Sequence, residues 1–219
     1  MTSPRKRVVV FISGGGSNMM ALVAAAKNQD FPAEIVGVIS DKPDAGGLAK
    51  ASAEGIATFA FSRKDYASKE AHEEAIFAAL DALSPDILCL AGYMRLLSGT
   101  FIQRYEGKMI NIHPSLLPLF PGLHTHQRAI DAGMRIAGCT VHFVTEGMDE
   151  GPVIGQAAVP VLSDDTADTL AARVLTVEHQ IYPQALKLFA EGKVRMEDGK
   201  AVRTADAPDT TATGAVISA

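Results

Sequence analysis

The stretch RVVVFISGGGSNMMALVAAAKNQ, from Arg7 to Gln29, decides the fold class. It opens with a short β-branched run typical of a buried strand, continues through three glycines, and ends in a longer run typical of a helix. Similar strand-like runs follow at EIVGVIS (34–40), ATFAFS (57–62), DILCLAG (86–92) and KMINIHP (108–114), with an amphipathic helix expected over 68–83. This alternation predicts a Rossmann-like, doubly wound α/β fold with parallel strands.

The pattern changes after residue 114. The runs AGCTVHFVTE (137–146) and GPVIGQAAVPV (151–161) are too close together for a crossover helix between them, which predicts an antiparallel C-terminal hairpin. The segment 164–192 is helical in pattern, with Asp165 or Thr166 as the expected N-cap and Pro183 as an expected kink or break. We therefore expect a mostly parallel sheet that ends in an antiparallel pair.

Composition narrows the class of protein. The chain has 219 residues, of which 47% are hydrophobic, and this predicts a single domain over 1–204, followed by a polar tail over 205–219 that we expect to be disordered. The net charge of -5 argues against nucleic acid as a partner, and every apolar run is too short to span a membrane. Cys89 and Cys139 both lie in apolar runs, so we expect reduced thiols and a cytoplasmic location.

Ligands of open α/β sheets bind at the carboxyl ends of the strands, which directs attention to the loops after them. The first is SGGGSN, 13–18, whose backbone N–H groups and following helix N-terminus can cradle an anion. A dinucleotide fingerprint needs a third glycine where Met19 stands, although Asp41 is placed as a ribose-binding acid, and the lysine of a Walker loop is absent. A plain tight turn is the remaining alternative, and we favour a single phosphate.

The loop NIHPSLLP, 111–118, carries an amide and an imidazole at the exit of a predicted strand. Strand alternation places Asn111 and His113 on the same side of the chain, where both can face one developing oxyanion. Pro114, Pro118 and Pro121 then restrict the backbone that follows. This arrangement favours acyl-transfer chemistry.

A metal site is the competing interpretation of the histidines. His124, His126, His142 and Asp149 supply enough ligands, but their spacing matches no compact metal motif. We therefore expect no metal. His72 lies in a charged helix and is expected to be solvated, whereas His142 is expected to lie in the core.

The stretch TEGMDEGPV, 145–153, joins the two strands of the predicted hairpin and is rich in acids and glycines. Glu146, Asp149 and Glu150 are its carboxylates. The glycines permit a turn that brings one carboxylate toward His113, where it would orient the ring, and an ordinary solvated loop is the alternative.

Taken together in this order, ISGGGSN, LAGYMRLLS, NIHPSLLPLFPGLHTH, GCTVHFVTEGMDEGPVI and EHQIYP resemble the formyltransferases that use 10-formyltetrahydrofolate. The resemblance runs from about Val8 to about Met196. The segment HPSLLP is shared with relatives that formylate methionyl-tRNA or nucleotide sugars, whereas the glycine loop and Glu178 are similar to the phosphoribosylglycinamide formyltransferases of purine biosynthesis.

The resemblance implies roles for individual residues. Asn111, His113 and Asp149 would be catalytic, and Gly16, Ser17, Asn18 and Glu178 would bind glycinamide ribonucleotide. The formyl folate would be bound by Lys69, Met94, Arg95, Leu96, Leu97, Asn111, Thr145 and Asp149. Lys69 departs from the family pattern, which commonly has an arginine there, and loses its bidentate fork.

The activity implied is transfer of the formyl group of 10-formyltetrahydrofolate to the amine of glycinamide ribonucleotide, by a monomer or homodimer with no metal. The alternatives are a hydrolase that releases formate from the same folate, another formyl-folate-dependent formyltransferase, or a non-catalytic sugar-phosphate sensor. A transfer-RNA formylase usually carries a second, basic domain.

Overall fold

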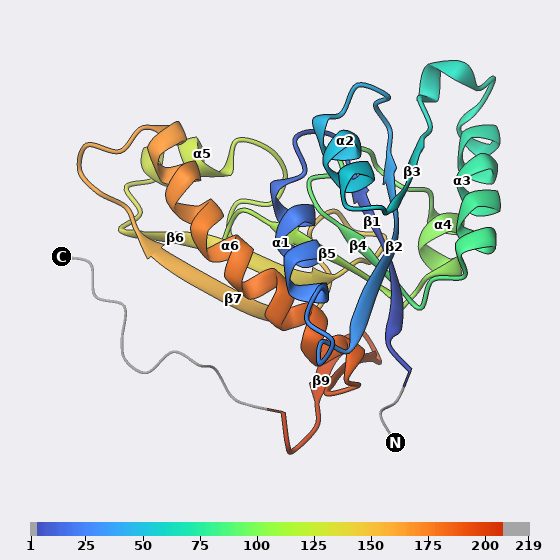
Figure 1. The fold of residues 1–219 in the computed structure, drawn as a ribbon. Helices are drawn as coiled ribbons and strands as arrows, with labels where there is room; N and C mark the ends of the chain where they lie inside the picture. The colour runs from blue at the N-terminus through green and yellow to red at the C-terminus, as the bar shows by residue number, and fades with distance from the viewer. Residues whose placement is uncertain (1–3, 208–219) are drawn as a thin grey trace. The chain divides into compact units, whose positions relative to one another are not determined.

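The structure is a computed structural model that describes residues 4–207 (Figure 1). The chain divides after Asn111 into two compact units, which we describe separately. The predicted single domain over 1–204 stays a prediction. Most of the tail expected to be disordered, 208–219, lies outside the described residues.

The first unit is built on parallel strands in the order β3-β2-β1-β4-β5. The strands are β1 (Lys6–Ile12), β2 (Ala33–Ser40), β3 (Ala57–Ala60), β4 (Ile87–Leu90) and β5 (Met109–His113), whose last two residues open the second unit. Each predicted parallel strand is confirmed to within about three residues. The predicted doubly wound, mostly parallel α/β class is confirmed as well.

Helices cover both faces of this sheet. Neighbouring side chains on β1 point to opposite faces, so each face presents apolar residues to the helices that cover it. Ile12 points toward α1 (Ser17–Ala26) and α2 (Gly46–Ala53), where a Cβ added at Gly47 would lie 2.5 Å from its Cδ1. Phe11 points to the other face, and its ring meets Phe101 of α4 (Gly99–Arg104) edge-on, with centroids 6.1 Å apart. Phe77 of α3 (Lys69–Leu83) stacks on Phe101 at 4.9 Å, so these rings form the core under α3 and α4.

The second unit contains the antiparallel pair that the sequence predicts. Strands β6 (Ile136–Phe143) and β7 (Val153–Pro160) pair along their length, and α6 (Ala167–Ala190) lies across them (Figure 1). The short helix α5 (Thr125–Asp131) precedes β6, and a second hairpin of β8 (Val194–Glu197) and β9 (Lys200–Arg203) follows α6.

Two local predictions for α6 have different outcomes. Thr166 is the N-cap and forms a capping box with Thr169, as expected for one of the two candidates. Of the kink or break predicted at Pro183, the break is wrong, because the helix continues to Ala190, and the kink stays a prediction. Tyr182 and Leu186, on either side of the proline, are fully buried, and their packing holds the helix together despite one missing backbone donor.

The prediction for His72 is also wrong. The side chain is buried with 2% of its surface exposed, and its Nε2 donates to the Phe61 carbonyl oxygen at 2.8 Å. The ring also meets Tyr66 edge-on. Its helix is charged along the sequence, but this position faces the chain that follows β3.

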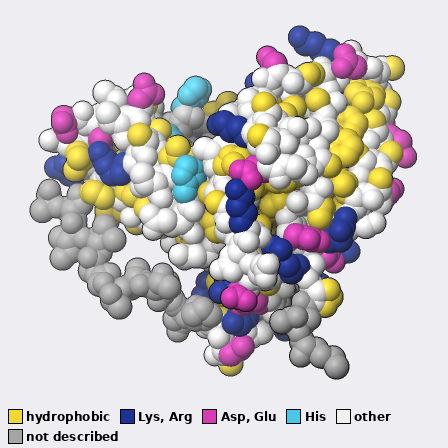
Figure 2. All heavy atoms as spheres, in the orientation of Figure 1, with side chains coloured by type: hydrophobic (Ala, Val, Ile, Leu, Met, Phe, Trp, Pro, Cys, Tyr) yellow, Lys and Arg dark blue, Asp and Glu magenta, His cyan; other side chains and the backbone are white. Residues whose placement is uncertain are grey.

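The charges on the surface and the two cysteines agree with what the composition predicts. Basic and acidic side chains are interspersed on the face in Figure 2. Cys89 and Cys139 are buried and form no disulfide. Of the helices between residues 4 and 207, not one combines the length and apolar character needed to cross a bilayer.

Candidate active site

His113 ends β5 and is held at both ring nitrogens. Its Nε2 lies 3.0 Å from the carbonyl oxygen of Phe120, which only accepts hydrogen bonds, so Nε2 carries a proton. Its Nδ1 then faces the carboxylate of Asp149, 3.4 Å from Oδ2. This second contact is attractive only when Nδ1 is protonated as well, and both side chains are largely buried.

Asp149 comes from the turn between β6 and β7 and is held in place by the chain itself. The backbone N–H of Gly122 donates to its Oδ2 at 2.8 Å. The residue has a left-handed backbone, with φ 58°, which aspartate tolerates better than most side chains. Two residues later the chain passes so close to β6 that a Cβ at Gly151 would lie 1.7 Å from the Phe143 carbonyl oxygen.

Of the three acids in this turn, Asp149 is the one that the structure brings to His113. The carboxyl group of Glu150 instead folds back toward Gly147, where an added Cβ would lie 2.3 Å from its Oε2. Thr145, which the resemblance assigns to folate, lies in the same turn and is partly buried. The turn therefore brings one carboxylate to His113, as the sequence predicted.

A second histidine, His142, faces Asp149; the sequence predicted it as a core residue and offered it as a ligand only in the metal interpretation. His142 is buried as expected, donates from Nδ1 to the Phe143 carbonyl oxygen at 2.8 Å, and has Nε2 3.9 Å from Asp149 Oδ1. Burial lowers the pKa of His142 below its usual value, and the hydrogen bond and the charge of Asp149 offset part of this effect. Asp149 thus lies between a buried imidazole and the ring of His113.

The loop after His113 is fastened to β6 and β7 by one hydroxyl group and one amide. Thr140 Oγ1 donates to the Ser115 carbonyl oxygen at 2.7 Å and accepts from the Leu117 N–H at 3.0 Å. Gln156 Nε2 donates to the Leu117 carbonyl oxygen at 2.8 Å and to Thr140 Oγ1 at 3.0 Å. These hydrogen bonds tie the backbone at Ser115 and Leu117 to the side chains of β6 and β7.

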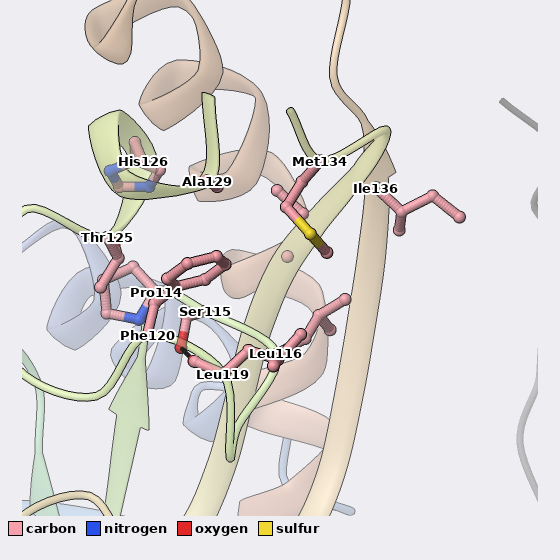
Figure 3. A pocket seen from close by; sticks show the side chains of 12 residues that line it. Pro114, Ser115, Leu116, Leu119, Phe120, Thr125, His126, Ala129, Met134 and Ile136 are labelled. Atoms are coloured by element: carbon pink, nitrogen blue, oxygen red, sulfur yellow. Dashed lines mark hydrogen bonds between the residues drawn. The ribbon is translucent and has the colours of Figure 1, made fainter. Parts of the chain in front are cut away.

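A pocket in the second unit lies between this loop, α5 and the start of β6 (Figure 3). Its lining is mostly apolar and includes Leu116, Leu119, Phe120, Ala129 and Met134. His126 lies at its edge, and burial, followed by the charge of His113, lowers its pKa.

One residue of the metal interpretation, His124, remains to be placed. His124 is the N-cap of α5 and has a left-handed backbone. Among residues 4–207, His, Cys, Asp and Glu side chains form no group of three or more that is arranged to hold a metal ion.

The glycine loop of the first unit lies between β1 and α1. Gly16 has φ 68°, and a Cβ there would lie 2.9 Å from Met19 and 3.0 Å from Gly47, so both conformation and space require glycine. Ser17 and Asn18 begin α1, whose first turn holds no acidic residue that would oppose an anion at the positive helix end. Lys50 Nζ donates to the Gly15 carbonyl oxygen at 2.8 Å and adds a cation beside this loop.

The carboxylate that kept a dinucleotide interpretation open has a different partner. Asp41 Oδ1 accepts a hydrogen bond from Ser13 Oγ at 2.5 Å. Ser13 Oγ in turn accepts from the Met94 N–H at 2.8 Å. Ser13 therefore links Asp41, which follows β2, to the loop after β4, an arrangement that no local sequence pattern indicates.

The surroundings of four further predicted site residues are defined by the structure. Met94 and Leu96 are exposed at 68% and 72% of their surfaces. Lys69 begins α3 and lies 3.9 Å from the buried carboxylate of Glu73. In the second unit, Glu178 is a buried residue of α6, and its charge acts together with burial to raise the pKa of Cys139 to about 12.

The remaining predicted residues are assigned to their units. The first unit carries Asn111, which is partly buried on β5, together with Arg95 and Leu97 of the loop after β4. The second unit carries His113, Thr145, Asp149 and Glu178.

Comparison with known proteins gives a consistent result. The model of the formyl transferase family matches residues 6–186. The phosphoribosylglycinamide formyltransferase of Escherichia coli is 45% identical over 194 residues, which cover 89% of this chain and 92% of that protein. A crystal structure of phosphoribosylglycinamide formyltransferase from Brucella melitensis is 74% identical, with a TM-score of 0.83, over 85% of this chain and 96% of that one.

Longer relatives are similar over only part of their length. The trifunctional purine biosynthetic protein adenosine-3 of Bos taurus is 49% identical over 199 residues, which are 90% of this chain but 20% of that protein. The chain thus spans about a fifth of such relatives and nearly all of the bacterial ones. On this evidence, the chain belongs to the formyl transferase family.

Proposed function

We propose that the protein transfers the formyl group of 10-formyltetrahydrofolate to the amine of glycinamide ribonucleotide. The observation that carries the proposal is the buried His113–Asp149 pair, in which the Gly122 N–H donates to the Asp149 carboxylate. The family match and the similarity to phosphoribosylglycinamide formyltransferases support this choice of reaction.

The catalytic roles follow from the chemistry of the groups. Attack of an amine on a formyl carbon places negative charge on the formyl oxygen, which the Asn111 amide and protonated His113 would stabilise. Asp149 would keep the proton on His113 Nδ1, or order a water that carries the proton from the attacking nitrogen to the leaving one. Because Phe120 holds Nε2, the ring acts through its Nδ1 side.

Glycinamide ribonucleotide would be bound at two places. Gly16, Ser17 and Asn18 would hold its phosphate, supported by the N-terminus of α1, whose first turn has no acidic residue, and by Lys50 beside the loop. Glu178 would pair with the glycinamide end.

The formyl folate would be bound by the loop from Met94 to Leu97 and by Thr145. It supplies an already activated formyl group, so the proposal needs no metal ion. The Met94 N–H already donates to Ser13 Oγ. The loop would therefore bind the folate through carbonyl oxygens, which accept, and through the backbone N–H groups of residues 95–97, which donate. Lys69 Nζ lies 3.9 Å from the Glu73 carboxylate, so the lysine would bind a folate carboxylate while it is also paired with Glu73.

A single assay tests the proposal. Purified protein is incubated with 10-formyltetrahydrofolate, with and without glycinamide ribonucleotide, and both folate turnover and formylated product are measured. We expect turnover that requires the ribonucleotide and yields one product molecule per folate consumed. Equal folate turnover without the ribonucleotide would instead identify a hydrolase, and binding of the ribonucleotide without turnover would identify a sensor.

A matched pair of variants separates binding from chemistry. Glu178→Gln should raise the KM for glycinamide ribonucleotide by about tenfold or more, because a charged hydrogen bond is lost. Glu191 is the control, since it lies on the last turn of the same helix and pairs with Lys193. Glu191→Gln should leave both substrate affinities unchanged.

A further inference from the structure

The loop from Tyr93 to Ser98 is shaped by side chains outside it. Met94 and Leu96 are largely exposed, and no backbone hydrogen bond forms at residues 95–97 within the described chain. Exposed side chains and unpaired backbone groups do not define a single conformation by themselves. The loop must therefore be fixed at its ends.

The first anchor is Ser13. Its one hydroxyl proton is directed to Asp41 Oδ1, 2.5 Å away, so its lone pairs face the Met94 N–H at 2.8 Å. The Ser13 N–H also donates to the Gly92 carbonyl oxygen at 3.1 Å. Ser13 thus forms hydrogen bonds with Gly92 and Met94, the residues on either side of Tyr93, where the loop 93–98 begins.

The second anchor is Glu73 on α3. One carboxylate oxygen accepts from the Ser98 N–H at 2.8 Å, and the other accepts from the Ser98 hydroxyl group. That hydroxyl group also caps α4 by accepting from the Phe101 N–H at 3.1 Å. Glu73 is only 6% exposed, and its nearest cation is Lys69 at 3.9 Å.

A buried carboxylate with one distant cation contributes little to stability, because desolvation opposes its interactions. Its two hydrogen bonds to one residue instead define where that residue lies. We propose that Ser13 and Glu73 are positioning residues that hold the loop 93–98 in the shape that receives the formyl donor. This inference rests on the proposed function, because the donor-binding role of the loop is part of it.

The two anchors have different expected effects. Glu73 forms hydrogen bonds with Ser98 at the far end of the loop and none with the glycine loop among the described residues, so Glu73→Gln should weaken binding of the donor alone. Ser13 also belongs to the glycine loop, so Ser13→Ala should weaken binding of both substrates. Ser13→Thr keeps the hydroxyl group and should retain most of the affinity, which a purely space-filling role would not predict.

The experiment measures binding of tetrahydrofolate and of glycinamide ribonucleotide to the full-length protein by titration calorimetry. For Glu73→Gln we expect about tenfold weaker binding of tetrahydrofolate, from the loss of a charged hydrogen-bond acceptor, and a change below about twofold for the ribonucleotide. Glu74 is exposed on the same helix, and Glu74→Gln is the matched control, expected to behave like the wild type. Hydrogen exchange at the Ser98 amide should accelerate in Glu73→Gln but not in Glu74→Gln.

The outcomes are distinguishable. If the wild type binds tetrahydrofolate and both anchor variants bind it equally well, the positioning inference is overturned while the proposed function stands. If the wild type binds no tetrahydrofolate, both are overturned. Should Glu73→Gln fail to fold, Glu73→Asp, which keeps the charge but shortens the reach, replaces it with the same expectations.

Discussion

Replacing Asp149 with asparagine tests the central pair with little change in shape. Asparagine adopts the left-handed backbone found here and can still accept from the Gly122 N–H, so the turn should persist. What disappears is the negative charge 3.4 Å from His113 Nδ1. At an effective dielectric constant near 20, the attraction lost with a protonated ring is about 5 kcal/mol.

This energy converts into a rate. If the charge acts mainly in the transition state, about 5 kcal/mol corresponds to a fall in kcat of between about three and four orders of magnitude. The KM values of both substrates should change by less than about threefold, because uniform binding is unaffected. Initial rates are measured from consumption of 10-formyltetrahydrofolate at saturating glycinamide ribonucleotide, with Asp164→Asn, an exposed neighbour of α6, as the control.

Refutation is straightforward. A folded Asp149→Asn protein whose kcat stays within about tenfold of the wild type would mean that the charge does not act on the reacting groups. A large rise in KM at unchanged kcat would assign Asp149 to binding instead.

Three further predictions concern other parts of the fold. Thr140→Val should lower the free energy of unfolding by about 2 to 4 kcal/mol in urea titrations, because it strips partners from buried backbone groups; a loss below about 1 kcal/mol would contradict this. Hydrogen bonds from Arg173 hold the pKa of Asp165 well below its usual range, so this carboxylate stabilises the fold at neutral pH. Asp165→Asn should therefore lower Tm at pH 7, and the deficit should shrink as the pH falls below about 4 toward the depressed folded value; a constant deficit would exclude the linkage. Lys69→Ala should weaken folate binding by the same factor whatever the number of glutamates on the folate if the lysine acts only through Glu73, whereas a factor that grows with tail length would indicate direct contact.

Much of the fold could be predicted because its strands are rich in β-branched residues and its longest helices are amphipathic. The elements that the sequence did not predict have weaker local signals. Helix α2 is GGLAKASA, with two glycines and little apolar periodicity, and α4 has only six residues. The hairpin of β8 and β9 has four residues in each strand. Elements this short depend on packing against residues far along the chain.

The site was predicted unevenly for a similar reason. A turn of three acids beside a histidine indicated that one carboxylate faces His113, but only the fold shows that the Gly122 amide selects Asp149. Backbone donors such as this one have no side-chain signature in a sequence. Ser13 follows β1, Asp41 follows β2 and Glu73 lies on α3. These residues are far apart in the sequence, so only the three-dimensional structure shows that hydrogen bonds from Ser13 and Glu73 position the loop after β4.

The positive φ of Asp149 also constrains how this position can drift over generations. Glutamate keeps the charge but tolerates that conformation poorly, so substitutions compatible with the turn are largely confined to aspartate, asparagine and glycine. Only the first of these is acidic. A related protein with asparagine or glycine at this position would keep the turn but lose the carboxylate. We expect such a protein to be inactive, and the residue at this single position would identify it.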